Sequence, residues 1–208
     1  MKLDAEGFEI EDGVDLHYRV LKELGDCYAT LGRHGEAWRC YRQAAELSPE
    51  QSAPLVGLGV VALQQGRLDS AASAFDDARR LNPACAEAYS GLAMVCQQRR
   101  DFAGAFDFYL QCLQFNSDNL VALLGLFQAS CQMGTFGKII HYLERYLDRH
   151  PGDTSVLFCL ASLYAREGQL LRAQDALLTV LALDPDKPDA QKLLDDVTYR
   201  LRQQPMTA

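Results

Sequence analysis

The chain has 208 residues, a formal net charge of −8 at pH 7 and 49% hydrophobic residues. This composition is typical of an ordinary soluble folded protein, and an acidic chain without a basic stripe is unsuited to binding nucleic acid. No stretch approaches the roughly 18 consecutive apolar residues of a membrane span, and the first residues lack the apolar core of a signal peptide. We therefore expect a cytoplasmic protein that does not insert into a membrane.

Residues 1–14 form an acidic N-terminal segment that we expect to be loosely attached to the fold. The stretch FEIEDGVDL, which begins there, carries Phe8, Ile10 and Val14 among acidic residues. Such a segment could fold back onto its own chain or onto a neighbouring copy. It would then act as an autoinhibitor or join copies head to tail.

A 34-residue period organises residues 15–187. The stretch LGDCYATLGRHGEAWRCYRQAAELSP at 24–49 is echoed by LGVVALQQGRLDSAASAFDDARRLNP at 58–83. Four of the recurring registers are Leu24, Leu58, Leu92, Leu126 and Leu160; Gly32, Gly66, Arg100, Gly134 and Gly168; Tyr41, Phe75, Tyr109, Leu143 and Leu177; and Pro49, Pro83, Ser117, Pro151 and Pro185. A fifth register runs through Ala37, Ala71, Ala105, Ile139 and Ala173. Chance does not hold five registers through five copies, so we predict a repeat array.

Each repeat is predicted to be a pair of helices. In the second copy, residues 52–64 carry apolar side chains at helical spacing and stop near Gly66, and residues 68–81 resume the pattern before Pro83. Glycine is the preferred residue just after a helix, and proline cannot continue one. Because one pair cannot bury both of its apolar faces, neighbouring pairs must stack.

These registers resemble the tetratricopeptide repeat (TPR) family, whose period is 34 residues. The resemblance covers five tandem repeats at 18–51, 52–85, 86–119, 120–153 and 154–187. It implies an all-α, right-handed superhelical solenoid of antiparallel helix pairs. It also implies that the first helix of each pair lines a concave groove that holds a protein or peptide partner.

Residues 188–204 are predicted to form a C-terminal capping helix, followed by a tail at 205–208. The apolar stripe of this helix is Ala190, Leu193, Leu194, Val197 and Leu201, with charges on the opposite face. A solenoid needs such a polar-backed helix at its open end. The alternative is a free helix that binds a partner.

No catalytic, metal-binding or cofactor-binding constellation emerges from the sequence. The four histidines lack an HxxxH spacing, and neither a phosphate loop nor a GxSxG motif is present. The seven cysteines are odd in number and form no CxxC pair, so we expect most of them to be small buried hydrophobic residues. We predict that the chain is not an enzyme and needs neither cofactor nor metal.

The concave face that the resemblance implies supplies the candidate binding residues. They are mostly apolar and polar-uncharged: Lys22, Val56, Val60, Leu63, Met94, Gln97, Leu124, Gln128, Phe158 and Ser162. A contiguous apolar strip commonly marks an interaction site, so we expect a hydrophobic or amphipathic segment as the ligand. The carboxylate clamp of chaperone-binding family members is not matched, because Asp26 and Gly57 stand where asparagines are needed.

The fourth repeat breaks the rule of small residues at helix contacts. Phe127 stands where Gly59 and Ala93 stand, Ile139 where Ala71 stands, and Tyr146 where Ala78 stands. Overpacking of this kind costs about 1–3 kcal/mol unless the backbone moves apart. Either the helices separate around 120–153, or neighbouring residues shrink in compensation.

The sequence thus predicts a protein–protein interaction adaptor or scaffold. Two alternatives remain open. The chain could be a structural protein that self-assembles through its N-terminal segment or its array ends, or it could be the regulatory module of a larger enzyme system.

Overall fold

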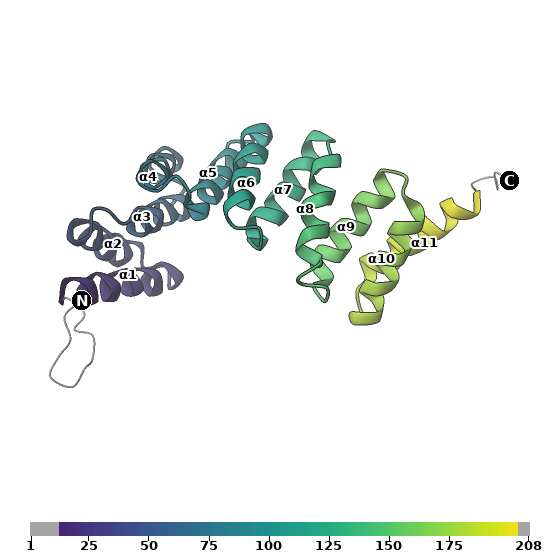
Figure 1. Ribbon diagram of the computed structural model, residues 1–208, viewed down its shortest axis with the longest axis horizontal. Helices are drawn as coiled ribbons and strands as arrows, with labels where there is room; N and C mark the ends of the chain where they lie inside the picture. The colour runs from purple at the N-terminus through teal and green to yellow at the C-terminus, as the bar shows by residue number, and fades with distance from the viewer. Residues whose placement is uncertain (1–12, 204–208) are drawn as a thin grey trace. The chain divides into compact units, whose positions relative to one another are not determined.

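The computed structural model describes residues 13–203 (for residues 14 and 138 the backbone alone), and this part of the chain is all helix and turn. The helices are α1 (Gly13–Thr30), α2 (His34–Leu47), α3 (Ala53–Gln64), α4 (Leu68–Leu81), α5 (Ala86–Gln98), α6 (Phe102–Phe115), α7 (Leu120–Met133), α8 (Gly137–Leu147), α9 (Thr154–Arg166), α10 (Leu170–Leu183) and α11 (Pro188–Gln203). The first ten follow one another as antiparallel pairs (Figure 1). The expected all-α array of helix pairs is confirmed, and the pairs are consistent with five repeats.

The turn between the two helices of each pair has a left-handed residue. In the glycine register, φ is +70° at Gly32, +71° at Gly66, +69° at Gly134 and +75° at Gly168. Arg100 takes the same place in the third pair and has a φ of +62°. Glycine adopts this conformation without a steric penalty, which explains why glycine recurs at this position of the repeat. The third turn keeps the same backbone conformation although its residue is an arginine.

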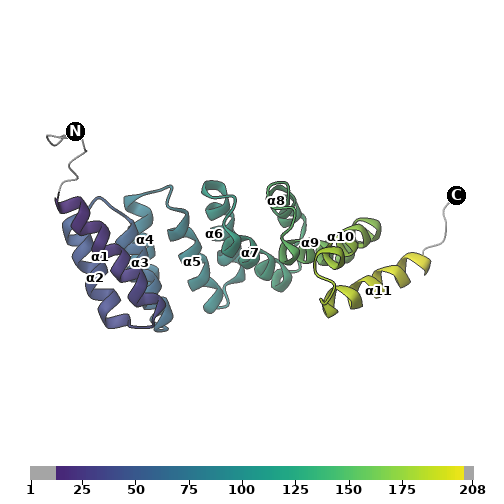
Figure 2. The ribbon, with the colours of Figure 1, turned by 90° about the horizontal axis from the view of Figure 1, so that it is seen from below.

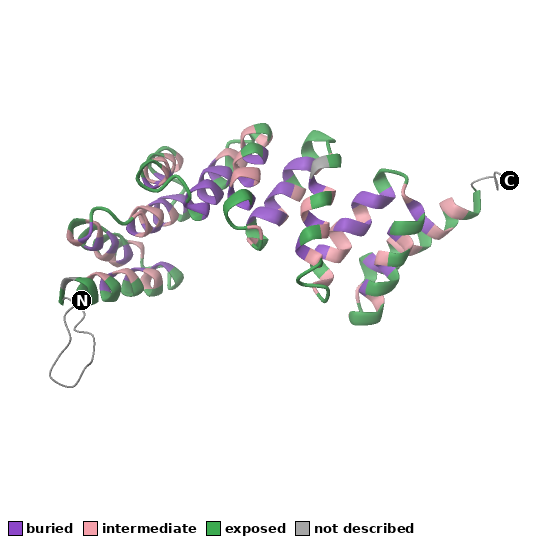
Figure 3. Cartoon of the chain, viewed as in Figure 1, coloured by how far each residue is buried: buried purple, intermediate pink, exposed green. Residues whose placement is uncertain are grey.

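The chain divides into two compact units, residues 1–116 and 117–208. The first unit contains α1–α6 and the second contains α7–α11. In each unit, the buried residues run along the faces that neighbouring helices turn toward one another (Figure 3).

Aromatic side chains fill the spaces between helices in the first unit. The buried ring of Tyr41 on α2 lies against Gly25 of α1 and Gly57 of α3, where a Cβ would overlap with it. The ring of Phe75 on α4 lies in the same way against Gly59 of α3 and Gly91 of α5. Each aromatic residue therefore joins its own pair of helices to the first helix of the next pair.

In the second unit, buried aliphatic side chains replace these rings. Leu143 of α8 and Leu177 of α10 are fully buried at the positions that Tyr41 and Phe75 hold in the first unit. Glu144 of α8 accepts hydrogen bonds from Tyr164 Oη and Arg172 Nη2, each 2.6 Å long, and so connects α8 to α9 and α10. These hydrogen bonds lower the pKa of the Glu144 carboxyl.

The fourth pair is more loosely associated than the others. The backbones of α7 and α8 lie close together over a shorter stretch than those of α3 and α4. Ile139 and Tyr146 are nevertheless buried, and Phe127 is half-buried. Of the two alternatives left open by the sequence, this favours separation of the helices, because the large side chains occupy space that alanine would leave to the backbone.

The C-terminal helix α11 packs against α10. Ala190 and Val197 of the predicted apolar stripe are buried, and Leu193, Leu194 and Leu201 are half-buried. Its outer residues Lys192, Asp195 and Tyr199 are exposed. The helix thus covers the apolar face of its neighbour, as a cap does, and turns polar groups outward.

All seven cysteines are free. Cys85 and Cys112 are buried, Cys27 is exposed, and the remaining four are half-buried. Burial raises the pKa of the Cys112 thiol to about 12 and that of Cys159 to about 11.

These thiols are expected to differ sharply in reactivity. With iodoacetamide at about pH 8, Cys27 should be modified first, because only about one thiol in 10³–10⁴ is ionised when its pKa is 11–12. Mass spectrometry of the labelled peptides measures the order of modification. The fully denatured chain is the control, in which all seven should react alike. Modification of Cys112 as fast as Cys27 in the folded protein would contradict its buried position.

Candidate functional site

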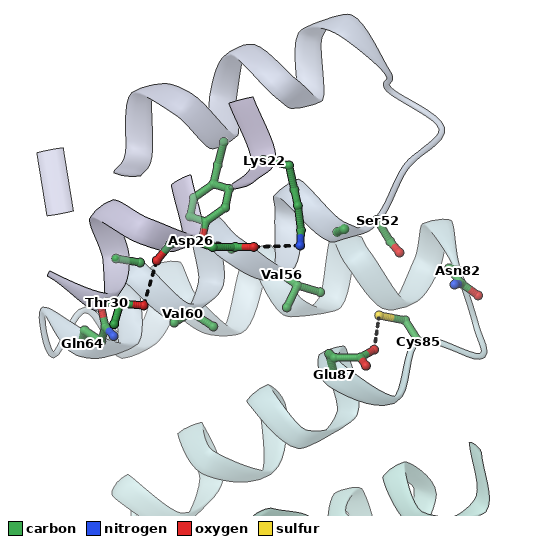
Figure 4. A pocket seen from close by; sticks show the side chains of 14 residues that line it. Lys22, Asp26, Thr30, Ser52, Val56, Val60, Gln64, Asn82, Cys85 and Glu87 are labelled. Carbon is green, nitrogen blue, oxygen red and sulfur yellow. Dashed lines mark hydrogen bonds and ion pairs between the residues drawn. The ribbon is translucent and has the colours of Figure 1, made fainter. Parts of the chain in front are cut away.

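A pocket of about 550 Å³ opens among the first helices of the first three pairs (Figure 4). Lys22, Asp26, Ala29 and Thr30 come from α1, and Val56, Gly57, Val60 and Gln64 come from α3. Cys85 and Glu87 close the pocket at the start of α5. Tyr41, Ser52, Ala53 and Asn82 complete the lining. Residues at positions 22, 26 and 29 share a wall because they are three or four apart on one helix.

One wall of the pocket is a hydrogen-bonded polar group centred on Asp26. Its carboxylate accepts a hydrogen bond from Tyr41 Oη at 2.7 Å and pairs with Lys22 Nζ at 2.7 Å. Thr30 Oγ1 donates to the Asp26 carbonyl at 2.9 Å. The hydrogen bond to Asp26 raises the pKa of Lys22, so this side chain stays positively charged. Burial, with the neighbouring carboxylate, raises the pKa of Tyr41. The phenol therefore stays protonated and keeps donating.

The floor of the pocket is apolar, and its far side is acidic. Val56 and Val60 are half-buried and pack on the cluster that surrounds Phe75. Cys85 Sγ lies 3.6 Å from Glu87 Oε2, and burial raises the pKa of this thiol. In Figure 4, Val56 lies between the Lys22–Asp26 pair and the Cys85–Glu87 contact. The pocket thus offers an apolar surface between an ion pair and a single carboxylate, which suits an apolar side chain with a neutral or basic neighbour.

Of the candidate groove residues in the first unit, Lys22, Val56 and Val60 line this pocket. Leu63 belongs to the buried core with Phe75 and Leu92. Met94 is exposed. Gln97 accepts a hydrogen bond from Tyr109 Oη at 2.8 Å, and this bond satisfies the hydroxyl of a buried ring.

The other four candidates belong to the second unit. Leu124 is half-buried and Gln128 is exposed. The Phe158 ring is half-buried, with the Lys187 ammonium group 5.6 Å from its centroid. Ser162 donates to the Phe158 carbonyl at 2.8 Å and lines a smaller hollow of about 340 Å³ beside Phe127 and Arg200.

Several lining residues were not among the candidates. They are Asp26, Ala29, Thr30, Tyr41, Ser52, Ala53, Gly57, Gln64, Asn82, Cys85 and Glu87. The sequence holds one signal for the polar wall, since Tyr41 stands in the register where the next repeat has Phe75. A buried tyrosine hydroxyl needs a hydrogen-bond partner, and the nearest acid on the preceding helix is Asp26.

The described residues contain no cluster of three or more side chains suited to holding a metal ion. Among helices α1–α11, none is long and apolar enough to cross a membrane. Cys85 also lacks the electropositive surroundings that activate a nucleophilic thiol, since its neighbour in the pocket is Glu87.

Comparison with known proteins points to one family. Sequence profiles of the tetratricopeptide repeat match residues 18–51 and 56–119. The first range coincides with the first predicted repeat. No curated protein sequence matches the chain.

Solved structures share the fold. PilF of Pseudomonas aeruginosa is 18% identical with a TM-score of 0.75, and the match spans 92% of this chain and 87% of PilF. A crystal structure of MamA is 21% identical over 83% of this chain and 94% of MamA, with a TM-score of 0.64. YrrB, described as a TPR protein with an unusual peptide-binding site, is 16% identical over 83% of this chain and 89% of its own, with a TM-score of 0.64. At these identities the structural likeness establishes the fold alone. The matched profiles, with the helix pairs, show that the chain belongs to the tetratricopeptide repeat family.

Proposed function

We propose that the chain is a non-enzymatic adaptor that holds a segment of a partner protein in the pocket among α1, α3 and α5. Tetratricopeptide repeats in general are protein-interaction modules, and the neighbour YrrB is described by its peptide-binding site. The observation that carries the proposal is the half-buried apolar floor at Val56 and Val60, which lines the open pocket. On one side it is bounded by the Lys22–Asp26 ion pair and on the other by the carboxylate of Glu87.

The pocket favours a ligand with an apolar side chain beside a basic or neutral residue. The apolar side chain would cover Val56 and Val60, which contributes about 1.5–3 kcal/mol before the costs of association. A basic residue would meet Glu87, whereas an acidic residue would be repelled by it. We propose the cytoplasm as the compartment, because the seven free thiols suit a reducing environment.

Val60→Asp is expected to weaken peptide binding by at least about tenfold, since it puts a carboxylate on the apolar floor. A phage-displayed library of random peptides, panned on the wild type, supplies the probes. Their affinities for the variant are then measured by calorimetry. The selected peptides should share an apolar residue and avoid acids next to it.

Two further variants make this test decisive. Leu171→Asp changes a 67% exposed leucine on α10 in the other unit and should leave binding unchanged. Lys22→Glu probes the same pocket without touching the core. Circular dichroism confirms that each variant is folded. Peptides that bind equally to all three variants would place the binding surface elsewhere.

A further inference from the structure

The only tryptophan of the chain lies on an open hollow away from the pocket. The α1–α2 and α3–α4 turns lie at the same end of the first unit (Figure 2). The hollow between them is lined by His34, Gly35, Trp38, Gln65 and Arg67, none of which lines the pocket. Trp38 is 39% exposed. Exposed tryptophans are enriched among the residues that dominate binding energy at protein interfaces.

This hollow is locally basic on an acidic protein. No carboxylate lines it. Within residues 13–203 the Arg67 side chain makes neither an ion pair nor a hydrogen bond, and His34 Nδ1 is buried without a hydrogen-bond partner. Arg42, which pairs with Glu46 at 3.1 Å, holds its guanidinium 5.0 Å from the centroid of the Trp38 ring. The surface therefore combines an aromatic face with the unneutralised charge of Arg67, which favours an acidic segment that carries an aromatic or aliphatic side chain.

We propose that the hollow binds the acidic segment 4–12 of a second copy of this chain. These residues, DAEGFEIED, lie outside the described part of the structure, so the proposal rests on their sequence and charge. They contain five carboxylates and no basic residue, with Phe8 and Ile10 among them. Phe8 packs on Trp38, and the neighbouring carboxylates pair with Arg67, whose planar guanidinium binds carboxylates in a bidentate way.

The segment of the same chain is too short to do this. Phe8 precedes Gly13, the first residue of α1, by five residues, which span at most about 18 Å when fully extended. The 18 residues of α1 are about 27 Å long, and the hollow lies beyond the C-terminal end of this helix, at the α1–α2 turn and the start of α2. We therefore assign the contact to the segment of another copy. This contact is separate from the pocket, and its failure would leave the proposed adaptor function untouched.

The first test uses a synthetic peptide of residues 1–12, titrated into the full chain at a concentration too low for self-association. Because Trp38 is the sole tryptophan, its fluorescence reports on the hollow directly. We expect a saturable change in emission. Two variant peptides should bind about tenfold or more weakly. One carries Phe8→Ala, and the other carries glutamine in place of Glu6, Glu9 and Glu11 together.

Arg67→Glu in the protein should weaken binding of the peptide to the same extent. Arg202→Glu is the matched control, because it makes the same charge change on α11 in the other unit and should have no effect. Circular dichroism verifies the fold of both variants. An unchanged Trp38 emission, or equal binding to the Arg67→Glu variant, overturns the proposal.

The second test measures the mass of the full chain by light scattering over a concentration series. We expect the average mass to rise above 23.1 kDa with concentration and to fall again with added salt, with free peptide or with Arg67→Glu. Association that persists in the Arg67→Glu variant would assign self-assembly to another surface, such as the exposed Leu16, Val20 and Leu24 of α1. A chain that stays monomeric while it binds the peptide would also refute the contact between copies.

Discussion

Phe75→Ala is expected to lower the free energy of unfolding by about 3–5 kcal/mol, the range measured for buried aromatic side chains cut to alanine. Phe75 is 1% exposed and packs with Leu63, Leu92 and Val95. Its ring connects the second pair of helices to α5. The loss therefore combines lost burial with a cavity at the junction of two repeats. Urea unfolding, followed by circular dichroism and by Trp38 fluorescence, measures it.

Phe115→Ala is the control for this experiment. Phe115 is 49% exposed and contributes chiefly a stacked contact with Tyr89, with the ring centroids 5.5 Å apart. Its replacement should cost no more than about 1.5 kcal/mol. Equal losses from the two changes would mean that Phe75 is not the more deeply packed residue. If circular dichroism and Trp38 fluorescence follow the same transition, the first unit unfolds together with the rest of the chain. Different transitions would mean that it unfolds separately.

The fold could be predicted from the sequence because one local pattern recurs. A repeat has to end its first helix and turn back within a few residues, and this requires a left-handed residue at one fixed position. The third repeat has Arg100 at this position, and its backbone is still left-handed, with a φ of +62°. The residue type thus departs from the pattern while the backbone keeps it, because the neighbouring repeats impose the same turn.

The candidate site was predicted only in part, because a helix face does not reveal how deeply each residue is covered. Val60 and Leu63 are three residues apart on α3 and lie on adjoining parts of its surface. The first lines the pocket, whereas the second is buried among Ala71, Phe75 and Leu92. The difference depends on the position of α4, which the spacing within α3 does not encode.

The polar wall was missed for a related reason. The hydrogen bond from Tyr41 to Asp26 joins residues on two helices. Family position alone marks Asp26 as a groove residue and Tyr41 as a packing residue. Their contact arises because Gly25 and Gly57 allow the Tyr41 ring to reach the groove side of α1 and α3. The pocket therefore depends on glycines that bring helices together as well as on the residues that face the ligand.

The second large effect is expected at such a glycine. Gly59→Val should lower the free energy of unfolding by about 2–3 kcal/mol, because the new side chain overpacks the core. A Cβ on Gly59 would lie 2.6 Å from Cε1 of Phe75, closer than real contacts of this kind. The ring has little room to retreat, since it also lies against Gly91 and is enclosed by Leu92 and Val95. Urea unfolding measures the loss. Gly35→Val is the matched control, because open space surrounds Gly35, and it should change stability by no more than about 0.5 kcal/mol.

A double-mutant cycle with Phe75→Ala separates this steric cause from other effects of valine in a helix. If the ring is what the new side chain meets, Gly59→Val should cost almost nothing once Phe75 is alanine, because the branched side chain then fills part of the cavity. The coupling free energy should reach about 2–3 kcal/mol, near the upper end for residues in direct contact. Additive losses would mean that the ring and the glycine do not touch. The aromatic register and the small-residue register would then be two separate features of the repeat, whereas a strong coupling makes them the two halves of one contact.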